Sequence, residues 1–361
     1  RAMGRRRSSL PVLLLPLLLL ALTLPLPSGG SARRKHKKKR EPQQPEITLE
    51  SCDGEERAAE LASYGQVFLD GAIASSRNDL MDAAKGCFAK AGKLHPNDPK
   101  GYVGMGNIKA AYGDSEGAHK LFQQALQLSL PGEEGEALLG LGSLEVMVAE
   151  KLGEAEVHLR AAIKLLPGSG KAHYLLGLAL TYQHKYEAAV ESYRESVRID
   201  PGSSSALGNL GGVLFGLGEL DEAVEYFEKA FKLTPGDSGL LKNTANANAK
   251  AKNWPRAVEL FSELLKREPG DEVAVVRRQH CRQHTCDWSS YDADTRAVRG
   301  IVASRLSRGE DPLVTPFDAL SMPLSPALLL DVARAEAREV GEKAGAGPFN
   351  PRPRLGRYKC R

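Results

Sequence analysis

Residues 170–201 read "GKAHYLLGLALTYQHKYEAAVESYRESVRIDP", and this stretch decides the fold. Within it, Ala189 is followed four residues later by Tyr193 and seven residues later by Ser196. Spacings of 0, +4 and +7 place three side chains on one face of an α-helix. Pro201 comes twelve residues after Ala189 and predicts the end of this helix and the start of the next, because proline is excluded from helix interiors and suits a first turn.

The same pattern recurs along the middle of the chain with a nearly constant period. Its alanine returns at Ala84, Ala118, Ala155, Ala189, Ala223 and Ala257, and only the interval from Ala118 to Ala155 is longer than the others. Leu-Gly pairs such as Leu176-Gly177 precede it, and glycine in a helix costs about 1 kcal/mol against alanine, which indicates a close backbone contact there. Six helix–turn–helix units fit, starting near residues 65, 99, 136, 170, 204 and 238.

A 34-residue unit, the interval from Ala155 to Ala189, with Leu-Gly, Ala, Phe/Tyr, Ala and Pro at these offsets resembles the tetratricopeptide repeat. The resemblance covers roughly residues 65–271. It implies an all-α fold, a right-handed superhelical solenoid of about six repeats whose periodic apolar residues form the core. It also implies protein or peptide ligands on the concave face, and it leaves a homodimer through the repeats open. The low aromatic content of 6% agrees with packed helices.

Two asparagines are candidates for that concave face. Asn209 and Asn243 stand two residues before the Gly or Ala of the Leu-Gly position. In the tetratricopeptide arrays of protein O-GlcNAc transferases, an Asn at this position holds the backbone amides of a bound polypeptide. The resemblance implies the same role for these two residues, and the alternative is that they are surface residues without a binding role.

The N-terminal segment 1–32 has the order of a secretory signal: a basic stretch with Arg5, Arg6 and Arg7, an apolar run from Leu10 to Leu26, and small residues at Gly30 and Ala32. We expect a cleaved signal peptide over 1–32 and a location in the secretory pathway. An uncleaved membrane anchor is the first alternative, and a cytoplasmic or nuclear location is the second. Residues 33–60, basic and Pro-rich, are expected to be a disordered linker.

Charge and cysteine content narrow the remaining function classes. Residues 1–40 hold eleven of the 49 Lys and Arg and no acidic residue, so the rest of the chain carries 38 basic against 45 acidic residues. A mildly acidic body predicts no nucleic-acid partner and leaves the N-terminal segment as the only expected membrane contact. Five cysteines are too sparse for a disulfide scaffold.

Beyond the repeats, residues 272–343 predict a helical junction segment. Asp292–Arg308 and a stretch from Ser325 to about Glu342 read as helices, with a Pro-rich extended loop between them. The segment resembles the junction of protein O-GlcNAc transferases, and of the related plant fucosyltransferases, where the repeats meet the catalytic region. The matching positions are Cys286-Asp287-Trp288, Tyr291, Arg296, Val314, Pro316-Phe317, Leu320, Pro323 and Leu328 to Ala333. Cys286, Trp288, Pro316 and Phe317 are expected to be structural residues of this junction, with Cys286 and Trp288 as its apolar anchors.

In that family two catalytic lobes follow the junction and bind a uridine diphosphate sugar. Here about 25 residues remain, and 344–361 are expected to be a basic, disordered tail. No Gly-rich phosphate loop or catalytic residue set is recognisable. We therefore expect a polypeptide-binding scaffold, the substrate-recognition part of an O-GlcNAc transferase-like protein, without catalytic residues or a cofactor in this chain; a UDP-sugar is expected only together with the lobes. The alternatives are a truncated form of an active UDP-sugar-dependent glycosyltransferase and a free-standing repeat adaptor of the secretory pathway.

The run "CRQHTCDW" (281–288) and the residue before it offer candidate metal ligands in His280, Cys281, His284 and Cys286. Structural zinc sites usually combine two ligand pairs about a dozen or more residues apart, whereas these four residues lie within seven positions. We predict no metal site, and a Cys281–Cys286 disulfide would be favoured only in a lumenal domain.

Overall fold

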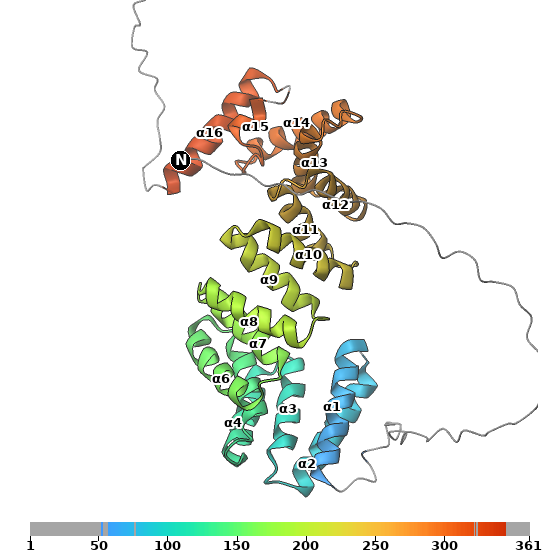
Figure 1. The fold of residues 1–361 in the computed structure, drawn as a ribbon, viewed down its shortest axis with the longest axis vertical. Helices are drawn as coiled ribbons and strands as arrows, with labels where there is room; N and C mark the ends of the chain where they lie inside the picture. The colour runs from blue at the N-terminus through green and yellow to red at the C-terminus, as the bar shows by residue number, and fades with distance from the viewer. Residues whose placement is uncertain (1–51, 53–56, 76, 321, 323, 344–361) are drawn as a thin grey trace, which may run out of the picture. The chain divides into compact units, whose positions relative to one another are not determined.

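The computed structural model describes residues 52, 57–75, 77–320, 322 and 324–343 (Figure 1). All secondary structure within these residues is helical, which confirms the predicted all-α class. The predicted signal peptide, residues 33–51 and 53–56 of the predicted linker and the predicted tail lie outside the described residues. No helix in the described part is long and apolar enough to cross a membrane.

Six helix pairs follow one another along the chain. They are α1 (Ala58–Ser75) with α2 (Asn78–Leu94), α3 (Pro99–Ala111) with α4 (Ser115–Leu128), α5 (Gly135–Glu145) with α6 (Leu152–Leu165), α7 (Gly170–Tyr182) with α8 (Tyr186–Ile199), α9 (Ser204–Leu217) with α10 (Leu220–Leu233), and α11 (Ser238–Lys250) with α12 (Trp254–Arg267). A short 3-10 turn, η1 (Ala149–Lys151), precedes α6. Each second helix also packs on the first helix of the next pair, as in a solenoid. Only α1 departs from the predicted starts by more than one residue, because it begins at Ala58 instead of near 65.

The periodic residues form the core of this array, as predicted. The six pattern alanines have no exposed surface, and the large apolar residues four positions later are at most 3% exposed: Phe88, Phe122, Leu159, Tyr193, Phe227 and Phe261. The Leu-Gly position marks a close contact, since a Cβ added at Gly177 would lie 2.7 Å from the Tyr193 ring. In the first five pairs, the second helix therefore packs a ring or a branched side chain against a glycine of its partner helix.

The junction between units differs from the prediction in one respect. Helix α8 ends at Ile199, two residues before Pro201, so proline does coincide with the helix end. The next helix starts from a cap instead of the proline: the Ser203 hydroxyl accepts a hydrogen bond from the Ala206 N–H at 3.3 Å. Asp237 and Asp271 cap α11 and the following helix in the same way. A side-chain oxygen that satisfies an unpaired N–H fixes the first turn more directly than proline can.

Four further helices follow the repeats: α13 (Glu272–His284), α14 (Tyr291–Ser307), α15 (Pro316–Leu320) and α16 (Pro326–Lys343). The predicted helices at 292–308 and 325–342 are confirmed within two residues, and α15 lies where an extended loop was expected. An apolar cluster joins these elements through Val276, Val298, Val302, Val314 and Val332.

The buried apolar residues do not form one continuous core. Within the described residues they divide into five clusters that succeed one another along the chain. The largest extends from α5 to α11, and smaller ones cover α1 to α3 and α10 to α13. Each helix is therefore stabilised mainly by apolar contacts with the helices next to it along the chain.

Candidate functional site

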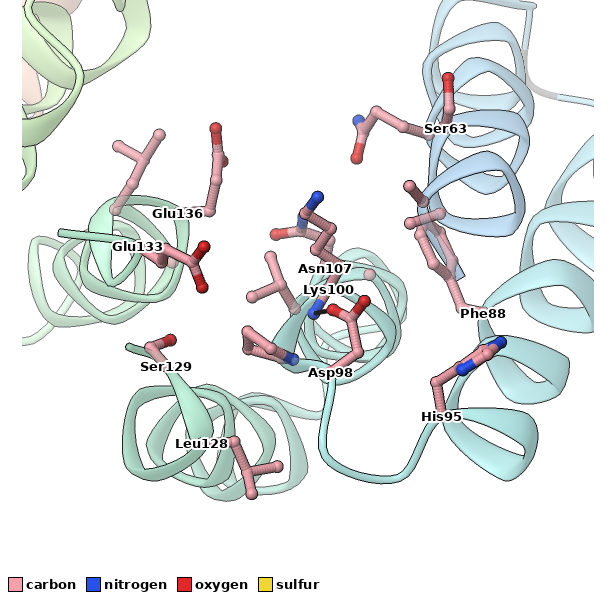
Figure 2. Close-up of a pocket in the computed structure, with 18 of the residues that line it drawn as sticks. Ser63, Phe88, His95, Asp98, Lys100, Asn107, Leu128, Ser129, Glu133 and Glu136 are labelled. Atoms are coloured by element: carbon pink, nitrogen blue, oxygen red, sulfur yellow. Dashed lines mark hydrogen bonds between the residues drawn. The ribbon is translucent and has the colours of Figure 1, made fainter. Parts of the chain in front are cut away.

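An open groove of about 1400 Å³ lies along the first helices of the N-terminal repeats. It is lined mainly by α1, α3 and α5, with the loops before α3 and α5 and the start of α7 completing it. Figure 2 shows Glu133 and Glu136 on one side, Ser63 and Phe88 on the other, and Lys100 and Asn107 between them.

The helical register brings these side chains to one surface. Lys100, Val103 and Asn107 are spaced by three and four residues on α3, so they share one face of that helix. Gln66 and Asp70 repeat the spacing on α1, where the Gln66 amide donates to the Asp70 carboxylate at 2.8 Å. Each first helix therefore contributes one stripe of side chains to the groove.

The chemistry of the groove is mixed, with an acidic excess. Its lining carries four carboxylates, of Asp70, Asp98, Glu133 and Glu136, against two lysines, Lys100 and Lys171. The Asp98 carboxylate also caps α3 by accepting from the Lys100 N–H at 2.9 Å. Apolar surface comes from Leu94, Val103 and Leu130, whereas Phe88 and Leu139 border the groove but are almost fully buried. Such a surface can hold both the backbone and the charged side chains of a polypeptide.

The two predicted asparagines lie outside this groove. Asn209 on α9 is half-buried and lines a second, smaller pocket between α7, α8 and α9. Its Nδ2 donates to the hydroxyl of Tyr174 at 3.1 Å. Burial raises the pKa of Tyr174, while the hydrogen bond from Asn209 acts in the opposite direction. Asn243 is exposed on α11 and lines neither pocket. The structure thus places the pair on successive first helices, and their role in holding a polypeptide stays a prediction.

The predicted junction residues differ from their expected role. Trp288 is 55% exposed, and the Cys286 thiol is also exposed. Neither residue anchors the last repeat helix; Trp288 packs edge-on against Tyr291 instead. Cys286 follows the end of α13 in a left-handed conformation with φ of 54°. Pro316 begins α15, and the side chain of Phe317 lies outside the described residues.

A carboxylate–arginine cluster holds this junction together. Asp294 on α14 accepts hydrogen bonds from Arg278 at 3.0 Å and from Arg282 at 2.6 Å, both on α13. The Asp294 side chain is only 9% exposed. Charged side chains therefore connect the two helices beside the valine cluster.

The histidines of the "CRQHTCDW" region form a ring cluster. His284 stacks on Trp254 with centroids 4.3 Å apart, and His280 packs edge-on against both rings. Cys281 is buried on the same helix. Among the described residues, no group of three or more His, Cys, Asp or Glu is placed to hold a metal ion.

Two features escaped the sequence analysis. One is the groove, because Asn107 and the groove carboxylates have no distinguishing motif in the sequence. The second feature is a disulfide between Cys52 and Cys87, which ties the segment before α1 to α2. The separation of 35 residues, close to one repeat period, was the only available signal.

Comparisons with known proteins agree with this architecture. Residues 145–204, 174–238 and 214–277 match family models of the tetratricopeptide repeat. Among solved structures, PilF of Pseudomonas aeruginosa is 17% identical and covers 63% of this chain and 99% of its own, with a TM-score of 0.51. At that identity the similarity shows the fold alone.

Two further solved structures match a smaller part of this chain. YrrB, described as a TPR protein with an unusual peptide-binding site, is 21% identical, with 53% of this chain and 93% of its own covered at a TM-score of 0.38. MamA of Desulfovibrio magneticus RS-1 is 23% identical, with 48% and 96% covered at a TM-score of 0.38. No curated protein matches the chain.

Proposed function

We propose that this tetratricopeptide-repeat protein binds an extended, positively charged polypeptide segment along the inner faces of α1, α3 and α5. The single observation that supports the proposal most is the open groove of about 1400 Å³ with its stripes of polar side chains from successive first helices. Tetratricopeptide-repeat proteins generally bind peptide or protein partners, and the concave surface of a solenoid is the usual place.

The polar groups of the groove suit an extended chain. An extended segment presents backbone N–H and C=O groups that no secondary structure satisfies, and a side-chain amide such as that of Asn107 can both donate and accept. Leu94, Val103 and Leu130 offer apolar surface to the side chains between those groups. The groove therefore favours an unfolded segment over a folded domain.

The charge of the groove favours a basic ligand. Four carboxylates face two lysines across the lining, and Glu133 and Glu136 lie together on one side (Figure 2). Complementary charge increases the association rate and selects against like-charged partners, and both effects weaken with salt. We therefore expect Lys- or Arg-containing segments to bind better than acidic ones.

A fluorescence anisotropy titration of the full chain tests this function. The probes are two labelled 15-residue peptides of equal length and hydrophobicity, one with five lysines and one with five glutamates. We expect the lysine peptide to bind about tenfold more tightly at low salt, with the difference shrinking as salt rises. The double variant Glu133→Gln/Glu136→Gln should lose most of this preference.

Glu116→Gln is the matched control, because Glu116 is exposed on α4, pairs with Lys120 and does not line the groove. The control should bind like the unchanged protein. Equal affinity for both peptides, or a preference that survives in the double variant, would contradict the proposal.

The junction resemblance supports a finer proposal, in which the array is the substrate-recognition part of an O-GlcNAc transferase-like protein. In this proposal the 361-residue chain binds polypeptide but transfers no sugar by itself. Incubation with a UDP-sugar and the bound peptide, read by intact-mass spectrometry, is the test. A peptide carrying one added sugar would contradict the proposal and favour an active glycosyltransferase.

We also propose that the protein resides in an oxidising compartment, as the signal-like N-terminus predicts. The supporting observation is the Cys52–Cys87 bridge, since such bonds persist in the secretory pathway and are rare in the reducing cytosol. Cells are treated with a permeant maleimide before lysis, and the chain is mapped by non-reducing peptide mass spectrometry. A linked 52–87 peptide is expected, and maleimide on both cysteines would contradict the proposal.

A further inference from the structure

A second pocket lies outside the groove of the N-terminal repeats. It has a volume of about 440 Å³ and is formed by α7 and α8 on one side and α9 on the other. Its lining is mostly apolar and aromatic: Leu178, Thr181, Tyr182, Tyr186, Tyr193, Asn209, Gly212, Val213 and Gly216. Tyr182 is 52% exposed and Tyr186 is 37% exposed, so two ring side chains are open to solvent beside it.

The pocket exists because α9 carries glycines on the side that borders it. Gly212 and Gly216 are four residues apart and share one face of the helix. A Cβ added at either position would meet nothing within 4 Å, so the space beside both residues is empty. Tyr186 is held beside this space by His184, whose Nδ1 lies 2.8 Å from the tyrosine hydroxyl.

The same positions are filled two repeats later. Trp254 begins α12 as Tyr186 begins α8, and His280 and His284 on α13 correspond to Gly212 and Gly216 on α9; each lies two repeat periods further along the chain. There the space is occupied by the protein's own side chains. The imidazole of His284 stacks on the indole of Trp254 with a centroid distance of 4.3 Å and an interplanar angle of 10°.

We propose that the pocket beside Tyr186 receives an aromatic or imidazole side chain from the bound polypeptide, which stacks there as His284 stacks on Trp254. This inference rests on the proposed polypeptide binding and adds a residue-type preference to it. Stacked rings gain more than their buried area alone provides, which distinguishes a flat ring from an aliphatic side chain of similar size. Asn209 lines the same pocket, so an inserted side chain would bring its own backbone towards that amide.

The test uses the full chain with methyl-labelled Leu and Val, and it needs no peptide. N-acetyltryptophanamide is titrated while the NMR signals of Leu178 and Val213 are followed, with N-acetylleucinamide as the matched aliphatic probe. We expect the tryptophan probe to shift both signals and the leucine probe to bind at least tenfold more weakly. Equal binding of the two probes, or no shift with either, would overturn the inference.

The double variant Gly212→His/Gly216→His copies the filled arrangement of α13. It should weaken the binding of the tryptophan probe at least tenfold. Gly86→His is the control, because Gly86 is exposed on α2 with open space around it. If circular dichroism shows that the double variant does not fold, the same titration is made with Tyr186→Ala. This variant removes the stacking partner without filling the pocket, so it should also weaken probe binding. Unchanged probe binding in the folded double variant or in Tyr186→Ala would overturn the inference. Failure of the lysine peptide to bind would contradict the proposed function while leaving this probe result intact.

Discussion

Gly104 on α3 lies so close to Phe88 on α2 that a Cβ at position 104 would be 2.1 Å from the phenyl ring. The contact lies between the first and second repeats, and Phe88 is one of the residues that border the groove. The absence of a side chain at Gly104 therefore sets how closely α2 and α3 pack beside the groove.

We predict that Gly104→Ala destabilises the N-terminal repeats by about 1–3 kcal/mol, because the added methyl group overfills a packed contact. Gly86→Ala, on the exposed side of α2 with open space around it, is the control and should stabilise the helix by about 0.5–1 kcal/mol. Urea unfolding followed by circular dichroism measures both. A Gly104→Ala protein as stable as the control would show that the contact is looser than described.

The cluster around Asp294 should be sensitive to loss of its charge. Asp294→Asn leaves the mostly buried Arg278 without its carboxylate partner and leaves Arg282 only Asp287, at 3.4 Å, and we expect a loss of about 3 kcal/mol in the stability of the α13–α14 junction. Asp331→Asn, which breaks an exposed pair with Arg334, should change stability by less than about 1 kcal/mol. Hydrogen exchange of the α13 and α14 amides measures the local stability of the junction in each variant. Similar exchange in the two variants would argue against a structural role for the cluster.

The two thiols of the junction should react at very different rates. Burial raises the pKa of Cys281 to about 11, so only about one thiol in a thousand is ionised at pH 8. Cys286 is exposed. In a Cys360→Ser background with the disulfide intact, Ellman's reagent should titrate one thiol quickly and the second only after unfolding. The added change Cys286→Ser should abolish the fast phase, and a fast phase that persists would place Cys281 at the surface.

The ion pair between Glu228 and Arg256 should make stability depend on pH. The hydrogen bond from Arg256 lowers the pKa of Glu228, with a further contribution from Asn248, so the folded state favours the ionised carboxylate. Its contribution is therefore present above the ordinary glutamate pKa of 4.5 and is lost as pH falls through the lowered folded value. Glu228→Gln should cost about 1 kcal/mol at pH 7, allowing for the solvent exposure of Arg256, and almost nothing near pH 2. Denaturant unfolding at both pH values measures the free energy of unfolding. A loss of stability in Glu228→Gln that is the same at both pH values would contradict the predicted pH dependence.

The repeat architecture was predictable because burial repeats with the chain. Ala189 and Tyr193 are buried for the same reason as Ala223 and Phe227, so six copies of one pattern reinforce each other. The helix caps at Ser203 and Asp237 could also have been predicted from the sequence, although we expected proline to start these helices.

The site was less predictable because it depends on how the repeats stack. Asn107 and Glu136 belong to different helices, and nothing in either local sequence indicates that they line one groove. Trp288 was expected to be an apolar anchor of the junction, but its side chain is 55% exposed. The Cys52–Cys87 pairing depends on the path of a segment that lacks the repeat pattern.

The division of the apolar residues into successive clusters has a consequence for cooperativity. A molecule with one core melts as a unit, whereas a chain whose neighbouring clusters stabilise only each other can lose its ends while the middle stays folded. The segment from α5 to α11, which holds the largest cluster, should then be the last to open on heating. The groove of α1, α3 and α5 spans the boundary between three clusters, so a ligand that bridges these helices would join segments that otherwise melt separately.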